Sequence, residues 1–389
     1  MTNKSFVRYS PELERTDPTF DSALETALDD IRRYISHPLP TAAGVRAVRD
    51  AHAKGYGLAR AELEILDGLP AEYSQGIYAH AGRHEAMVRF SNGSNQTLAD
   101  AQLGYVTGVG IKFFDIDGPT LLEDEPDSRT FDYALINYPV FFCNTVEHYT
   151  FIHELILSSP ESRADETPSQ QRARLHQFLY DFLTGRGQLR PDEWAWDELG
   201  VYLSLKYVKP VNLLLSTYWT MGSMRHGDYV AKVRFTPTPD SAAHVERRML
   251  DPASGPDIFR NGLVAELRER PYEFDIQVQL CVDLERMPVE DLTVLWPEEL
   301  SPFVTVAKLR LPQQDIGGDD NFERMDVASM TPWRVTEAHR PLGNMQRARK
   351  EVYRTASILR HQLNHQPRKE PADLAEVFGQ SRPDQAKAA

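Results

Sequence analysis

Two stretches far apart in the sequence carry the side chains whose chemistry is most informative. In "RARKEVYRTASILR", Arg349 and Tyr353 are four residues apart, so in a helix they share a face one turn from each other. Arg360, seven residues beyond Tyr353, falls on the same face. A guanidinium beside a phenol oxygen favours the phenolate, and a phenolate is an axial ligand for ferric haem iron. Taken alone, such a pair is more often an ordinary helix-surface contact.

The second stretch, "VRDAHAKGYG", places His52 among small residues. Ala51 and Ala53 leave space around the imidazole, while Gly55 and Gly57 let the backbone approach another group closely. A histidine in an ordinary core packs against bulky apolar neighbours, so this pattern favours an imidazole that faces a flat ligand. Imidazole suits proton transfer because its ordinary pKa lies near neutrality.

The bulk composition narrows the classes of function. The 389 residues include 41% hydrophobic and 26% charged residues, which is typical of a soluble globular protein. A net charge of −14 argues against nucleic acid or an anionic membrane as the main partner. Cys143 and Cys281 form no CxxC motif or disulfide framework, which favours the cytoplasm. No signal peptide is expected, and the longest apolar run, Val211 to Trp219, is too short to span a membrane.

The hydrophobic periodicity predicts the elements that must position these groups. A first helix is expected over Ser22–Ile35, capped by Asp21 or Ser22. Period-2 alternation predicts strands in "GLARAELEIL", "EAMVRFSNG", "GVGIKFFDI", "FDYALIN", "DYVAKVRFTP", "YEFDIQVQLCV" and "FVTVAKLRL". Apolar stripes predict helices over 145–159 and 169–183, and a C-terminal helix over 344–362.

Strands and helices do not alternate along the chain as they do in βαβ units. The expected fold is therefore α+β: an antiparallel barrel of about eight strands with helical insertions and a C-terminal helix. The expected division is an N-terminal arm and helix (1–40), a barrel domain (41–366) and a polar, loosely ordered tail (367–389). The segment from Asp315 to Asp326 is expected to be a polar loop.

Six segments occur in the order found in a known family: "RDAHAKGYG", "VRFSNGS", "GVGIKFF", "INYPVFF" with "FIH", "VAKLRL" and "RARKEVYRTASILR". Together they span most of the chain, and on them the sequence resembles the catalase superfamily of haem proteins. The resemblance is closest to the small, truncated branch, which includes catalase-related peroxidases and the allene oxide synthases and hydroperoxide lyases of this fold. It implies a barrel domain that binds haem b (iron protoporphyrin IX).

The resemblance also implies roles for individual residues. His52 matches the distal acid–base histidine, and Tyr353, beside Arg349, matches the axial iron ligand. Asn137 matches the distal asparagine, with a strand-end turn residue as the alternative. The other matches are to residues that contact haem: Arg49, Arg89 and Arg360 at the propionates, Ser91 on the distal side, and Phe141, beside Phe142, at the border of the pocket.

Two reactions fit such a site. The first is decomposition of H2O2, or its use as an oxidant, by a cytoplasmic catalase or peroxidase. The alternative is cleavage or isomerisation of a fatty-acid hydroperoxide. Ala51 stands where catalases resemble one another in having valine and allene oxide synthases in having threonine; an apolar residue favours peroxide chemistry, but its small size favours a bulkier substrate. A haem enzyme of specialised metabolism and a non-catalytic haem carrier remain further alternatives. Homodimers or homotetramers are expected from the resemblance alone.

Overall fold

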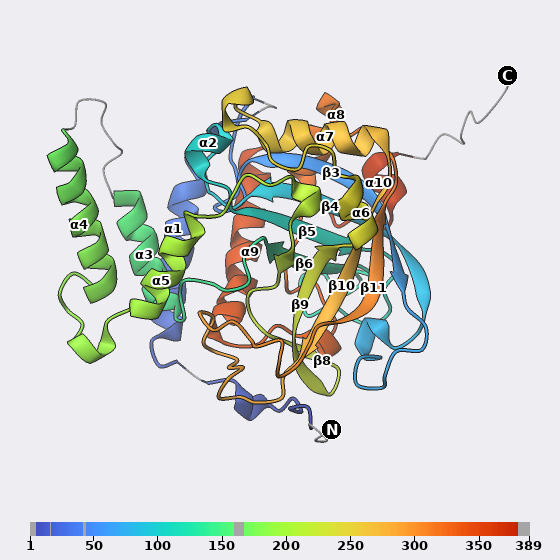
Figure 1. Cartoon of the computed structure of the whole chain (residues 1–389), viewed down its shortest axis with the longest axis horizontal. Helices are drawn as coiled ribbons and strands as arrows, with labels where there is room; N and C mark the ends of the chain where they lie inside the picture. Colours follow the sequence, from blue (N-terminus) through green and yellow to red (C-terminus); the bar gives the residue numbers. More distant parts are fainter. Residues whose placement is uncertain (1–4, 16, 42–43, 159–166, 380–389) are drawn as a thin grey trace.

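The computed structural model describes residues 5–15, 17–41, 44–158 and 167–379. Within these residues the centre of the protein is a closed antiparallel barrel of eight strands (Figure 1). The strands are β3 (Gly55–Ile65), β4 (Gly82–Asn92), β5 (Thr107–Phe113), β6 (Phe131–Ile136), β7 (Tyr218–Trp219), β9 (Tyr229–Pro237), β10 (Tyr272–Leu280) and β11 (Val304–Leu311). They follow one another in the order β10, β11, β3, β4, β5, β6, β7, β9, and β9 pairs with β10 to close the barrel. The predicted α+β class and antiparallel barrel are confirmed.

The barrel interior is a packed apolar core. Along β10, Phe274, Ile276 and Val278 are buried in alternation with Asp275 and Gln277, as the period-2 pattern predicts. The rings of Phe235 and Phe274 stack across the interior with centroids 4.1 Å apart. Because side chains fill this space, a large ligand has to bind outside the barrel.

The outer face of β4, β5 and β6 offers that space. The register pairs Arg89 with Gly110, and Gly110 with Ala134, so one row across the three strands carries two very small side chains. The next row along the sheet pairs Ser91 with Gly108. Small residues on this face leave a gap between the sheet and whatever covers it.

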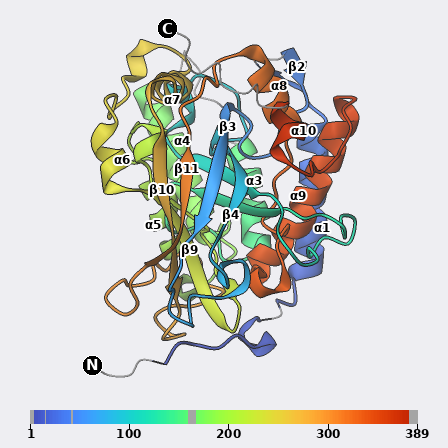
Figure 2. The ribbon, with the colours of Figure 1, turned by 90° about the vertical axis from the view of Figure 1, so that its right-hand side faces the viewer.

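Helices cover the barrel on several sides. Their bounds are α1 (Phe20–Ile35), α2 (Asp100–Leu103), α3 (Val146–Ser158), α4 (Pro168–Thr184), α5 (Trp196–Leu205), α6 (Pro239–His244), α7 (Ile258–Glu269), α8 (Asp319–Val327), α9 (Asn344–Leu363) and α10 (Leu374–Phe378). The long helix α9 packs against α1, and α1 packs against α3. Helices α3, α4 and α5 form a lobe beside the barrel, at the left of Figure 1, whereas α8 and α10 lie near α9 in Figure 2. Strands β1 (Leu39–Thr41) and β2 (Gly44–Arg46) form a separate pair, and β8 (Met224–His226) adds to β9.

Two predicted boundaries need correction. The first helix begins at Phe20 and follows Thr19, two residues earlier than expected. The segment 315–326 is not simply a loop, because α8 forms within it. The side chain of Asn321 accepts from Leu58 N at 2.9 Å and donates to Leu58 O at 2.7 Å, and Met325 is buried. Tertiary contacts with β3, not hydrophobic periodicity, stabilise this helix.

The expectation of a loosely ordered tail is wrong for residues 368–379. Helix α10 forms there, Leu374 is buried, and Glu370 accepts from Thr130 Oγ1 at 2.6 Å and from Lys112 Nζ at 2.5 Å. The remaining tail residues, 380–389, lie outside the described ranges. The division of the chain into domains stays a prediction.

A buried ion cluster fixes this tail to the sheet. Lys112 and Asp132 are neighbours on β5 and β6, and their side chains are fully buried and 2.6 Å apart. Arg334, also fully buried, donates to Asp132 and is 3.1 Å from Glu370. Burial alone would lower the pKa of Arg334, but the neighbouring carboxylates outweigh burial and raise this pKa. The cluster lies one row further along the same outer face than Gly110 and Ala134, so it holds the segments that border the gap.

Removing one partner from this cluster should be costly. Asp132→Ala removes one of the two carboxylates shared by two buried cations, and we expect the free energy of unfolding to fall by about 3–5 kcal/mol. Chemical denaturation followed by circular dichroism measures it. Glu298→Ala removes a carboxylate that pairs with Arg234 at 2.7 Å but is half-exposed, so its effect should stay below about 1 kcal/mol. Equal losses in the two variants would contradict the assigned role of the cluster.

Candidate functional site

A cavity of about 500 Å³ lies between the outer face of β4–β6 and helices α1, α3 and α9. Its wall includes eight of the nine side chains that the sequence singled out. These are Arg49, His52, Arg89, Ser91, Phe141, Arg349, Tyr353 and Arg360. They come from four separate segments of the chain, and the fold brings them to one place.

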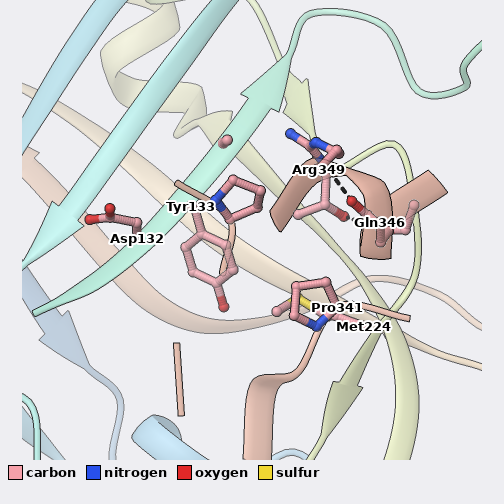
Figure 3. A pocket seen from close by; sticks show the side chains of 10 residues that line it. Asp132, Tyr133, Met224, Pro341, Gln346 and Arg349 are labelled. Carbon is pink, nitrogen blue, oxygen red and sulfur yellow. Dashed lines mark hydrogen bonds between the residues drawn. The ribbon is translucent and has the colours of Figure 1, made fainter. Parts of the chain in front are cut away.

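Helix α9 presents the phenol and its guanidinium neighbour together. Arg349 Nη2 donates to the hydroxyl oxygen of Tyr353 at 3.1 Å, as the four-residue spacing predicts. Arg349 Nη1 donates to Gln346 Oε1 at 2.7 Å, and Figure 3 shows this bond beside a small pocket of about 20 Å³. Gln346 is held in turn, since Trp333 Nε1 donates to its backbone carbonyl oxygen at 2.6 Å. The guanidinium is therefore fixed from both sides.

His52 faces the same cavity with one nitrogen already engaged. Its Nδ1 lies 2.5 Å from the carbonyl oxygen of Asn92, which accepts a hydrogen bond from Nδ1–H, so Nε2 is the basic nitrogen. Burial lowers the pKa of His52 to about 4, and the charges of Arg89, Arg349 and Arg49 lower it further. At neutral pH the imidazole is therefore a neutral base.

The backbone and one glycine keep the imidazole in place. His52 has a φ of 60°, in the left-handed region that non-glycine residues rarely adopt. A Cβ atom at Gly108 would lie 2.4 Å from His52 Cε1 and would displace the ring. Ser91 Oγ lies 3.3 Å from His52 Nδ1. Such a strained, crowded placement is typical of functional residues.

Three guanidinium groups line the cavity with few anionic partners. Arg49 donates to Ala328 O at 2.6 Å, Arg89 donates to His52 O at 3.0 Å, and Arg360 donates to Asp326 O. Burial lowers the pKa of all three, and repulsion between the guanidinium groups lowers the pKa of Arg89 and Arg360 further. Within the described ranges, the buried Nε of Arg89 has no hydrogen-bond partner. The arrangement calls for an anionic ligand with more than one acceptor group.

Asn137 does not belong to this group, and the structure argues against its expected distal role. Its Oδ1 accepts from Thr107 N at 2.8 Å, and its Nδ2 donates to Tyr105 O at 3.1 Å. The amide thus bridges the end of β6 to the start of β5 and is not among the residues that line the cavity. The strand-end alternative describes it correctly.

The sequence reasoning missed two residues of the site. Gln346 precedes Arg349 by three residues, so helical spacing alone could have placed it on the same face. Asp50, two residues before His52, also lines the cavity. In the part of the chain that is described, no group of three or more His, Cys, Asp or Glu side chains is arranged to hold a metal ion. The described helices include none whose length and apolar character would suffice for a transmembrane span.

Comparison with known proteins finds similarity to catalases in sequence and in fold. No family model matches the chain. Catalase A of Aspergillus fumigatus is 23% identical over 307 residues, which are 74% of this chain but only 36% of that protein. Three solved structures have a similar fold at low identity: a fungal catalase (TM-score 0.61, 17% identity), catalase A from Saccharomyces cerevisiae (0.55, 17%) and a bacterial catalase (0.57, 16%). Each covers 100% of this chain, which in turn covers 75%, 78% and 70% of them, respectively.

The barrel with its outer cavity therefore has the catalase fold. In sequence the chain is similar to a catalase at low identity, and it spans about a third of that relative's length.

The protonation state of His52 can be measured directly. We expect its imidazole to stay neutral down to about pH 5, because burial and three guanidinium groups hold its pKa at about 4. Since the unfolded chain has the ordinary pKa of about 6.5, stability should be lost as the pH falls from there toward 4. Nitrogen-15 NMR of histidine side chains reports the titration, and the signal absent from His52→Gln gives the assignment. Titration of that signal at the ordinary value would contradict the buried, basic imidazole.

Proposed function

We propose that the chain is a haem-b-dependent enzyme of catalase type that acts on hydroperoxides, decomposing H2O2 or using it as an oxidant. One observation carries the proposal: a guanidinium-paired phenol and a neutral histidine face the same cavity. A haem carrier would need only the phenol side. The proposed location is the cytoplasm, in accord with the two buried, unpaired cysteines.

The residues fit a haem. A haem carries two carboxylates on one edge, and the cavity offers Arg49, Arg89 and Arg360, of which Arg89 has an unsatisfied buried nitrogen. The small side chains of Gly110 and Ala134 leave room for a flat ring. Tyr353 would provide the phenol oxygen that binds the iron. When bound, the haem iron would supply the electrons that break the O–O bond of the peroxide.

The protein's own residues account for the proton movements. Nε2 of His52 would accept a proton from one peroxide oxygen and donate it to the other. The bond from Nδ1 to Asn92 O keeps the tautomer that this transfer requires. Arg349 donates to the oxygen of Tyr353 at 3.1 Å, and Gln346 holds the guanidinium in place.

A second candidate substrate is an organic hydroperoxide, such as that of a fatty acid. The cavity extends from His52 to apolar and aromatic side chains of the helical lobe, including Ile156, Tyr202 and Leu205. Ala51 also lines it and leaves more space than a valine would. Such an apolar extension suits the chain of a lipid better than it suits H2O2.

Two assays on the haemin-reconstituted protein separate the candidates. Oxygen evolution from H2O2 tests the first, and loss of the conjugated-diene absorbance of a linoleate hydroperoxide tests the second. In both, His52→Ala should retain haem but lower turnover by about 10²–10⁴-fold, the usual contribution of a general acid–base group. His244→Ala, which removes a half-exposed histidine of α6, should have no effect. Haem-loaded protein that turns over neither substrate would contradict the proposal.

Tyr353→Phe tests the axial ligand. Removing the phenol oxygen should abolish haem retention on gel filtration, or change the ferric spectrum, because the iron loses its protein ligand. The Soret band after reconstitution with haemin measures both effects. Tyr207→Phe is the matched control, since Tyr207 is 82% exposed. A Tyr353→Phe protein with full haem content and an unaltered spectrum would exclude this residue as the ligand.

A further inference from the structure

Asp50 is a carboxylate inside the cavity that the reaction described above does not use. It lies two residues before His52, and of the described residues that line the cavity it is the one with a carboxylate. Ala27 of α1 and Tyr149 of α3 line the cavity as well. Burial raises the pKa of Tyr34 and of Tyr149, and the charge of Asp50 adds to this effect. These two phenols are therefore neighbours of Asp50.

Among the described residues the carboxylate of Asp50 forms no direct ion pair, although Arg49 lies near enough to lower its pKa. Within the described residues no ion pair and no hydrogen bond joins it to another side chain; its contacts are the backbone N–H groups of Asp50 and Ala51. The nearby guanidinium of Arg49 donates to the carbonyl oxygens of Met325 and Ala328. Burial raises the pKa of Asp50 to about 6, although the two N–H groups and Arg49 act against it. A partly buried carboxylate that forms no direct ion pair costs stability, so its presence in a ligand cavity calls for a ligand-based explanation.

Aromatic side chains complete a site for a cation. Phe141, Phe142 and Tyr149 line the cavity, and the rings of Phe141 and Phe142 lie 4.6 Å apart between centroids. Aromatic faces attract ammonium groups, and an unpaired carboxylate supplies the opposite charge. The guanidinium groups of Arg49, Arg89 and Arg360, in contrast, are suited to the carboxylates of haem.

We propose that Asp50 binds the protonated amine of an organic electron donor, so that the cavity selects cationic donors over neutral and anionic ones. The donor role rests on the proposed function, whereas binding of the amine does not. In the reaction, one H2O2 takes up two electrons and two protons and becomes two molecules of water. Two phenolic donors supply them, each losing one electron and one proton to become a phenoxyl radical.

Three phenols with the same two-carbon link to the ring and a terminal group of different charge test the selection. Tyramine is cationic, 4-ethylphenol is neutral and 3-(4-hydroxyphenyl)propionate is anionic. Their dissociation constants are measured by isothermal titration calorimetry on the full haem-loaded chain at pH 7.5, where a carboxyl with a pKa of about 6 is ionised. We expect tyramine to bind about tenfold more tightly than 4-ethylphenol, as one charge-assisted hydrogen bond provides, and the propionate to bind most weakly.

Asp50→Asn should bring tyramine to the affinity of 4-ethylphenol and leave 4-ethylphenol unchanged. Asp29→Asn, which removes the same charge from an exposed site on α1, should preserve the preference. Equal binding of the three phenols by the wild-type chain overturns the proposal without any variant, and so does a preference that survives in Asp50→Asn. If the chain takes up no haem, the proposed function fails, and the same titrations on the haem-free chain still decide the role of Asp50.

Discussion

The arrangement of the site depends on three guanidinium groups buried around one cavity. Arg49, Arg89 and Arg360 repel one another in a region that little solvent reaches, and backbone carbonyls satisfy only part of their hydrogen-bonding capacity. Such a cluster costs stability unless an anion completes it. Burial, assisted by the charges of Arg89, Arg349 and Arg49, keeps the nearby imidazole of His52 neutral. A ligand with two carboxylates would therefore stabilise the folded chain, and the histidine remains a base because it is buried beside cations.

The barrel separates this site from the core through the alternation of its strands. Inward-facing residues of β4, β5 and β6 fill the barrel, whereas the outward-facing Arg89, Gly110 and Ala134 border the cavity. One row further along, Lys112 and Asp132 begin the buried ion cluster. Small residues thus create the cavity, and charged residues beside them hold the covering segments in place. A one-residue slip in register would exchange the core and the site, so the strand pattern fixes the position of both.

The sequence predicts the elements with strong local periodicity and the residues whose partners lie on the same element. Arg349 and Tyr353 meet because helix geometry alone brings them together. Asn137 was wrongly placed in the site because the direction of a side chain at a strand end depends on the neighbouring strand, here on Thr107. Helix α8 and the packing of Glu370 depend on contacts with residues over two hundred positions away. No local pattern contains such information.

The environment of each titratable group, more than its residue type, determines its role in the cavity. Burial acts on both His52 and Asp50 and favours the neutral form of each. For His52 the surrounding cations act in the same direction, so its pKa lies far below neutrality and the imidazole is ready to accept a proton. For Asp50 the backbone N–H groups and Arg49 oppose burial, so its carboxyl remains ionised near neutral pH. The cavity thus keeps a neutral base and an anionic group two residues apart, which allows proton transfer and recognition of a cation to be performed by separate side chains.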